Sequence, residues 1–213
     1  MRIARFAVAA TLLAAAGAAQ AALTFTNPTS VAIGPDEGAA SPYPSSILVS
    51  GAGTDLLSLT VDFFDLSLTW PSDVHAVLEG PTGAAIVLMA NAGRGFDFSD
   101  VDLTFDDAAA GPLPFNAQIV SGTYQVSQYN SAETMPAPAP SPAFGTNLSA
   151  FAGLDPNGTW SLWLYDDTNF DGGSLAGGWG LNLEAAQAPV PASALLLLTG
   201  LGALAGVGRV CRR

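Results

Sequence analysis

The chain has 213 residues and a net charge of -12, with six arginines and no lysine. The stretch 22–188 holds all 18 acidic residues and only one arginine, Arg94, which gives it a net charge of -17. This charge excludes nucleic-acid binding, which needs a basic patch, and argues against docking on anionic membrane surfaces. The single cysteine, Cys211, excludes a disulfide framework, a thiol enzyme and a zinc site built from cysteines.

The first 21 residues have the layout of a secretory signal peptide. Arg2 and Arg5 precede an apolar run over 6–19, and Ala19 and Ala21 form an A-x-A pattern. We therefore expect a signal helix that is cleaved after Ala21, and an exported mature domain. The alternative is a buried N-terminal helix, although the alanine-rich run has no polar face.

The segment 22–186 has the alternating pattern of an all-β domain, with turn residues every eight to twelve positions. The clearest run is 57–70, in which the apolar positions change phase between Phe63 and Phe64. A β-bulge is predicted at that point, because a slip of one residue otherwise turns every later side chain to the wrong face. The predicted inward residues are Leu57, Leu59, Val61, Phe63, Phe64, Leu66, Leu68 and Trp70.

Seven further strands are predicted, over 74–78, 85–89, 101–105, 117–120, 123–126, 159–165 and 179–183. In the first of them Val74, Ala76 and Leu78 face the core, so His75 and Glu79 are expected on the outward face. The segment 127–142 contains four prolines at alternate positions from Pro136, which favours polyproline II geometry. It is predicted to be an exposed loop insertion, mobile or semi-rigid.

The C-terminal segment 187–213 combines an apolar run with a terminal arginine cluster (Arg209, Arg212, Arg213). Residues 189–208 provide the roughly 20 residues that a transmembrane helix needs. Arginines on one side only would keep that end in the cytoplasm and the acidic domain outside. A permanent single-span anchor is one interpretation of this segment.

The layout of Ala-Pro-Val-Pro-Ala-Ser over 188–193, followed by the apolar run and the arginines, resembles the PEP-CTERM sorting signal of Gram-negative bacteria. Ala192 and Ser193 stand where that motif usually has Glu and Pro. The resemblance implies an exosortase-like sorting protease in the inner membrane as a partner, and release to the cell surface or the extracellular matrix.

The body of the chain resembles the P domain, also called Homo B, of subtilisin-like proprotein convertases. The likeness rests on residues 61–83, 104–107 and 148–183, including Asn157-Gly158-Thr159-Trp160, Asp171-Gly172 and Trp179. It implies a jelly-roll-like, galactose-binding-like β-sandwich that performs no chemistry itself. Leu68 stands where the family often has His before Thr-Trp. Peptidase activity is not expected, because no protease domain accompanies the P-domain-like segment.

Catalysis has few candidate residues. A hydrolytic triad needs a base, and the chain has one histidine, His75, and no G-x-S-x-G elbow. We expect His75 to be a solvated residue on a polar strand face. A glycosidase with paired carboxylates stays open, since 18 acidic residues form many possible pairs.

The sequence supports a calcium site more specifically than it supports catalysis. Asp167-x-Asn169-x-Asp171-Gly172 matches the first half of a calcium loop, in which oxygen ligands alternate and glycine permits a sharp turn. Gly178 replaces the Glu of an EF-hand, so the remaining ligands are expected from elsewhere. The candidates are Asp166, with Asp73, Asp106 or Asp107. The alternative is an ordinary hairpin turn rich in Asp, Asn and Gly.

Three functions agree with these patterns. The leading hypothesis is a non-catalytic surface or matrix protein that contacts extracellular polysaccharide or another surface protein. The second is an accessory module that acts with a separate subtilisin-like serine endopeptidase. The third is a carbohydrate-binding module with an exposed Trp70 or Trp163.

Overall fold

The computed structural model describes residues 22–130, 134–141 and 144–186. The predicted signal peptide (1–21) and sorting segment (187–213) lie outside the described residues. The regular structure of the described part is β-strand, apart from two short 3-10 helices, η1 (Pro71–Asp73) and η2 (Leu148–Phe151). In that part of the chain, no helix has the length and apolarity needed to cross a bilayer.

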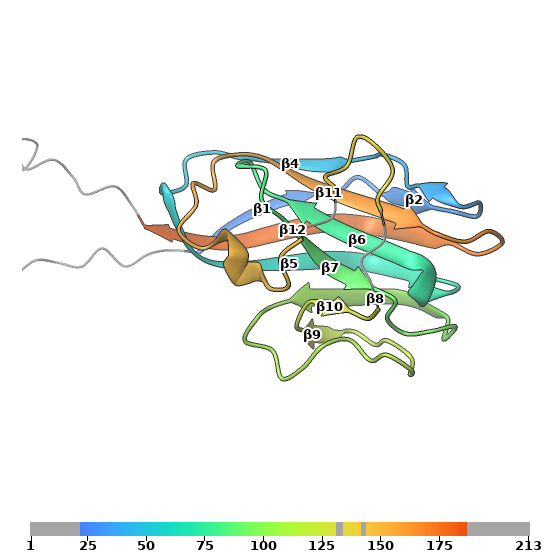
Figure 1. Cartoon of the computed structure of the whole chain (residues 1–213). Helices are drawn as coiled ribbons and strands as arrows, with labels where there is room; N and C mark the ends of the chain where they lie inside the picture. The colour runs from blue at the N-terminus through green and yellow to red at the C-terminus, as the bar shows by residue number, and fades with distance from the viewer. Residues whose placement is uncertain (1–21, 131–133, 142–143, 187–213) are drawn as a thin grey trace, which may run out of the picture.

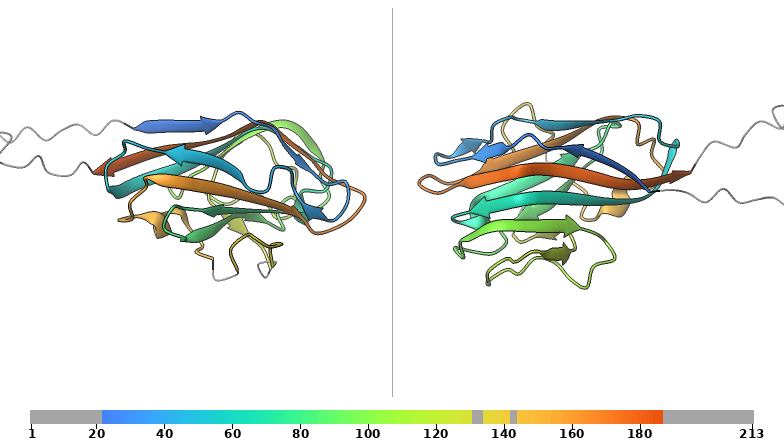
Figure 2. Two further views of the ribbon diagram at one scale, coloured as in Figure 1. Left: turned by 90° about the horizontal axis from the view of Figure 1, so that it is seen from above. Right: turned by 180° about the vertical axis from the view of Figure 1, so that it is seen from behind.

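Two six-stranded sheets stack face to face as a β-sandwich, which confirms the all-β prediction (Figures 1 and 2). The first sheet has the order β1-β12-β5-β8-β9, with β2 also beside β12, and its strands are β1 (Leu23–Asn27), β2 (Val31–Ile33), β5 (Asp55–Leu68), β8 (Phe98–Phe105), β9 (Gly122–Tyr124) and β12 (Gly173–Ala186). The second has the order β10-β7-β6-β11-β3, with β4 also beside β11, and its strands are β3 (Gly38–Ala39), β4 (Ser45–Val49), β6 (Val74–Glu79), β7 (Ala85–Ala90), β10 (Ser127–Gln128) and β11 (Gly158–Asp166). At the sheet edges β9 pairs parallel with β8 and β10 pairs parallel with β7, whereas the other strand pairs are antiparallel.

The phase change predicted in β5 is confirmed. Phe63 pairs with Leu103 of β8 and Leu66 pairs with Val101, so that two residues of β5 stand opposite one residue of β8. Asp65 occupies the left-handed region with φ +53, and its amide donates to Asp102 Oδ1 at 2.9 Å. The bulge therefore keeps Phe63 and Leu66 buried in the core although they are three positions apart.

Three of the inward residues predicted for this run were wrong. Leu57 is 51% exposed, because a second register shift at Glu184/Ala185 brings Leu56 to the core instead. Phe64 is only half-buried and lies outside the core cluster. Trp70 is 49% exposed, since β5 ends at Leu68 and the chain turns into η1.

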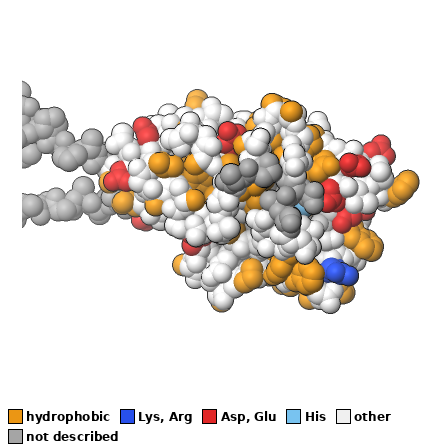
Figure 3. All heavy atoms as spheres, in the orientation of Figure 1, with side chains coloured by type: hydrophobic (Ala, Val, Ile, Leu, Met, Phe, Trp, Pro, Cys, Tyr) orange, Lys and Arg blue, Asp and Glu red, His pale blue; other side chains and the backbone are white. Residues whose placement is uncertain are grey.

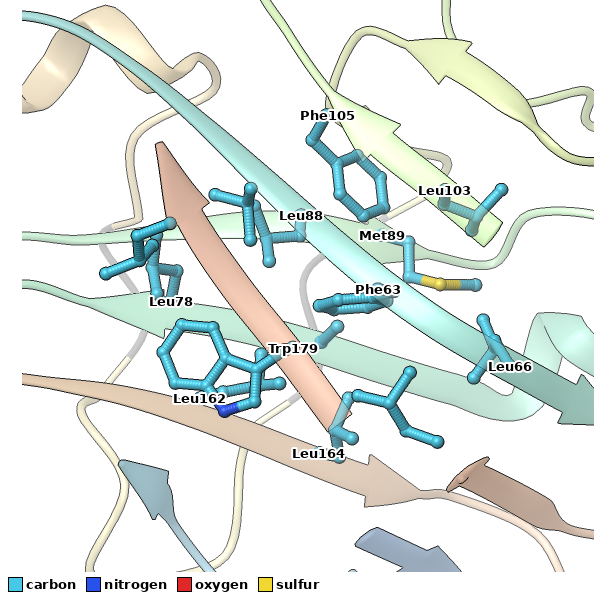
Figure 4. Packing of buried hydrophobic residues seen from close by; sticks show 14 of the residues in the cluster. Phe63, Leu66, Leu78, Leu88, Met89, Leu103, Phe105, Leu162, Leu164 and Trp179 are labelled. Atoms are coloured by element: carbon cyan, nitrogen blue, oxygen red, sulfur yellow. The ribbon is translucent and has the colours of Figure 1, made fainter. Parts of the chain in front are cut away.

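The main core lies between the sheets (Figure 4). Phe63 and Phe105 pack edge to face with ring centroids 5.3 Å apart, and Trp179 is fully buried beside them in the same cluster. The Trp179 Nε1–H donates to Ser45 Oγ at 2.9 Å, so this large ring is buried without an unpaired donor. The hydrogen bond joins β12 of one sheet to β4 of the other.

A second, smaller apolar cluster covers the outer face of the second sheet. Val77, Val87 and Trp163 point outward and pack with Met135, which is buried. Tyr43 contacts Trp163 with ring centroids 4.8 Å apart, and its hydroxyl donates to the Pro136 carbonyl at 2.8 Å. Because this outward face is apolar, its burial under another segment of the chain is favourable.

The prediction of an exposed loop over 127–142 was wrong in two places. Ser127–Gln128 form the edge strand β10, and Met135 lies in the outer cluster. The predicted strands at 74–78, 85–89, 101–105, 123–126, 159–165 and 179–183 overlap β6, β7, β8, β9, β11 and β12, although β8 and β12 begin earlier and β9 ends at Tyr124. No strand forms over 117–120, and the short strands β1 to β4 had not been predicted.

Candidate functional site

Several acidic side chains gather at one end of the sandwich, at the right of Figure 3. We call the group Asp73, Asp166, Asp167 and Asp171 the acidic corner. Asp73 ends η1, and the other three lie at the end of β11 and in the β11–β12 hairpin. The two segments are joined by the backbone, because the Asp167 amide donates to the Asp73 carbonyl at 2.9 Å.

The loop after β2 closes the corner from a third side. The Phe170 amide donates to the Pro35 carbonyl at 2.8 Å, and the Glu37 amide donates to Asn169 Oδ1 at 3.1 Å. Gly34 has φ +63, and a Cβ there would lie 2.8 Å from Asp166 Oδ2 and collide with the Asp171 carbonyl. Only glycine lets the backbone approach these oxygens so closely.

Two carboxylate oxygens of the corner are buried without a hydrogen-bond partner. Asp166 is fully buried, and its Oδ1 accepts from the Thr168 amide at 3.2 Å while its Oδ2 has no partner. Asp171 Oδ1 is also buried and unpaired. Burial without a compensating partner costs about 1–3 kcal/mol for a polar group and more for a charge. Such atoms are candidates to bind a cation or a proton.

The pKa values of both carboxyl groups respond to this environment. Burial raises the pKa of Asp166 to about 6, and repulsion from Asp171, Asp73 and Asp167 adds to the rise. Burial also raises the pKa of Asp171, with further repulsion from Asp73 and Asp167. The corner therefore favours protons or cations that offset its negative charge.

His75 is not the solvated residue that the strand alternation predicted. It is 2% exposed, because its face of β6 is the covered outer face of the second sheet, and its Nε2 lies 3.0 Å from Asp167 Oδ2. The Thr168 hydroxyl donates to Asp167 Oδ1 at 3.0 Å. Val77, an apolar residue at the next outward position of the strand, was the signal in the sequence that this face is covered.

The structure narrows the predicted ligand set. Both carboxylate oxygens of Asp167 have partners, Asn169 Oδ1 accepts a backbone amide, and Asp73 Oδ1 accepts from the Ser72 hydroxyl at 2.9 Å. Asp166 Oδ2 and Asp171 Oδ1 are the carboxylate oxygens of the corner that are buried without a partner. Within the described residues, no three His, Cys, Asp or Glu side chains are grouped so that they could hold a metal ion.

Asp106 and Asp107 are engaged at another place in the fold. Asp107 accepts the amides of Leu148 and Ser149 at 2.9 and 2.8 Å and so holds the start of η2. Asp106 Oδ1 accepts the Ala108 amide at 2.8 Å within its own turn. Both residues border a cavity of about 230 Å³ beside Leu57, and they hold loops in place there.

The raised pKa of Asp166 predicts how stability depends on pH in calcium-free buffer. The folded state retains its proton up to about pH 6, whereas the unfolded carboxyl ionises near its usual value of about 3.9. The free energy of unfolding is therefore expected to fall as the pH rises from about 4 to about 6, and then to level off.

This contribution can be isolated by comparing thermal melts of the native chain and Asp166→Asn over that pH range. The comparison is needed because groups such as Asp155, whose pKa is lowered by hydrogen bonds from Asn157, act in the opposite direction. A difference in Tm that is independent of pH would contradict the assignment of Asp166 as the titrating group.

Comparison with known proteins adds no assignment: no family model matches the chain, and no curated protein is significantly similar to it.

Proposed function

We propose that this protein is a non-catalytic, exported β-sandwich module of the cell surface or extracellular matrix. The observation that carries the proposal is the position of His75, the one histidine of the chain. Its ring is buried on the outer face of β6 and its Nε2 is engaged by Asp167, so it is a poor candidate for a base that meets a substrate. This supports a binding or structural role for the module.

Export is proposed from the two ends of the chain. The basic start, apolar run and A-x-A pattern of 1–21 support a signal peptide, and 187–213 support a PEP-CTERM-like signal handled by an exosortase-like protease. We further propose a P-domain-like module with jelly-roll-like topology, which the order of the motifs over 61–183 supports. The net charge of -17 over 22–188 suits a solvated extracellular domain.

We also propose that a calcium ion reinforces the acidic corner. Asp166 Oδ2 and Asp171 Oδ1 are the two residue atoms that would begin its ligand shell. Calcium takes six to eight oxygen ligands and accepts backbone carbonyls and water, so two carboxylates are compatible with an extracellular site of modest affinity. When bound, the ion would offset the repulsion among Asp73, Asp166, Asp167 and Asp171.

The test of export uses the full chain expressed in a Gram-negative host with an exosortase, followed by fractionation and intact mass. We expect a species that begins at Ala22 in the envelope or medium. A variant lacking 187–213 should leave the membrane fraction entirely and appear as free exported protein. Full-length protein that stays in the cytoplasm would contradict the proposal.

A further inference from the structure

An open groove with polar and apolar lining residues lies beside the end of β5 and the start of β8. Its volume is about 560 Å³, and it runs between these strands and the segment 118–121. Six of its lining residues carry hydroxyl, amide or carboxylate groups: Thr69, Asp97, Ser99, Asp100, Gln118 and Ser121. The lining thus offers acceptors and donors for a ligand that is rich in hydroxyl groups.

Exposed aromatic residues adjoin this groove in the chain. Trp70 follows the lining residue Thr69 and is 49% exposed, and Phe96 precedes the lining residue Asp97 and is 44% exposed. Phe115, on the neighbouring loop, is also exposed, and the Arg94 guanidinium lies over its ring with 5.6 Å from Cζ to the ring centroid. Arg94 is the one cation of the stretch 22–188 and is visible in Figure 3 as the blue side chain.

One face of the Trp70 indole lies against Gly95. A Cβ on Gly95 would lie 2.8 Å from Cη2, 2.8 Å from Cζ3 and 2.9 Å from Cζ2 of that ring. Nearly equal distances to three consecutive ring atoms place Gly95 above the face of the ring and not at its edge. One face is thus held against the backbone of Gly95, and the half-exposure of the residue is consistent with the opposite face being open to solvent.

Backbone hydrogen bonds hold this platform in place. The Ser72 amide donates to the Arg94 carbonyl at 3.2 Å, which joins η1 to the turn that carries Gly95. The Gly93 amide donates to the Pro114 carbonyl at 2.8 Å, and the Gln118 side-chain amide donates to the Asp97 carbonyl at 2.7 Å. Because these residues are already ordered, less conformational entropy is lost when a ligand binds.

We infer that Trp70 and the adjoining groove bind a neutral polysaccharide. A pyranose ring has one or two apolar faces of C–H groups, which stack on the negative face of an indole, and hydroxyl groups that bond carboxylate and amide side chains. Asp97 and Asp100, together with the charge of -17 over 22–188, repel polyanions such as uronic-acid polymers. The inference deepens the proposed function by naming its partner class, and it rests on that function being binding.

The test is a binding series with the full chain purified in mild detergent. The probes are neutral β-1,3-glucan, β-1,4-glucan, α-1,4-glucan, mannan and galactan, with alginate and polygalacturonate as anionic probes. Affinity electrophoresis and calorimetry are expected to show binding to at least one neutral polymer and none to the anionic ones. Trp70→Ala should weaken that binding by about tenfold or more.

Two further variants separate loss of the site from loss of the fold. Ser99→Trp places a large ring in the groove at an exposed position of β8 and should also abolish binding, whereas Phe170→Ala, at an aromatic that is 97% exposed in the β11–β12 hairpin, should not change it. Absence of binding to every neutral polymer, or binding that both Trp70→Ala and Ser99→Trp leave intact, would overturn the inference. Export measured by fractionation is an independent readout, so the proposed surface function can fail or hold separately.

Discussion

Trp179→Ala is expected to destabilise the folded domain by about 3–5 kcal/mol. Trp179 is fully buried between the sheets and stands opposite Phe63 of the neighbouring strand β5. Its indole N–H donates to Ser45 Oγ. The substitution removes a large apolar surface, leaves a cavity and deprives Ser45 of a partner in the opposite sheet. The effect is a large fraction of the total stability of a domain of this size.

Urea denaturation followed by circular dichroism measures this loss directly. The matched control is Leu48→Ala, which also truncates an apolar strand residue but at a position that is 69% exposed on β4. It is expected to change the free energy of unfolding by less than about 0.5 kcal/mol. Equal losses in the two variants would show that the space between the sheets is not the core.

Calcium is expected to raise the Tm of the native chain by about 3–11 °C at a concentration ten- to hundredfold above its Kd. That excess corresponds to about 1.4–2.7 kcal/mol by mass action, and about 2–4 °C accompany each kcal/mol in a domain of this size. Asp166→Asn should reduce the shift to about 1 °C or less. Because it removes a buried, unpaired carboxylate, the variant should also melt higher than the native chain in calcium-free buffer at neutral pH.

Asp55→Asn is the control for the loss of one negative charge. Asp55 is exposed at the start of β5, and its substitution should leave the calcium shift unchanged. Calorimetric titration with calcium, repeated with magnesium, separates a specific site from general screening of the acidic surface. An unshifted Tm in the native chain, or an equal shift in Asp166→Asn, would contradict a site at the acidic corner.

The long strands were predictable because their signal is local. The two-residue period of β5 and its interruption after Phe63 follow from residues that are neighbours in the sequence. The exposure of Leu57 was not predictable in this way, because it depends on the pairing of β5 with β12, in which Leu57 is an extra residue between Leu56 and Ser58. The strands β1 to β4 are short, and only pairing with β11 and β12 identifies them as strands.

The burial of His75 shows a second limit of local patterns. Alternation along β6 assigns His75 and Val77 to one face, but it does not tell that this face is buried; Val77 packs there with Met135, about 60 residues later in the chain. The pattern of 127–142 favours extended geometry over pairing, and it says nothing about which surface the segment covers. Covered outer faces of sheets are therefore the main source of error in such predictions.

The acidic corner was predictable only in part. The spacing of Asp167, Asn169 and Asp171 marks an oxygen-rich turn, but it does not tell which oxygens are already used by backbone amides, His75 or Thr168. The close approach of Gly34 comes from a loop more than 130 residues earlier in the chain and had no signal in the motif. The available oxygens of Asp166 and Asp171 emerge only from the three-dimensional contacts.

The two described ends of the domain lie together, since Leu23 pairs with Leu183, whereas the β11–β12 hairpin and η1 lie at the far end of the sandwich (Figures 1 and 2). Tension between Ala186 and a ligand held at the far end would therefore run along the axis of β12. This strand is hydrogen-bonded to β5 on one side and to β1 and β2 on the other. The hydrogen bonds between β12 and its neighbours are perpendicular to the strand, so a force along β12 would load them in shear. Many backbone hydrogen bonds would then share the force and would not open one after another.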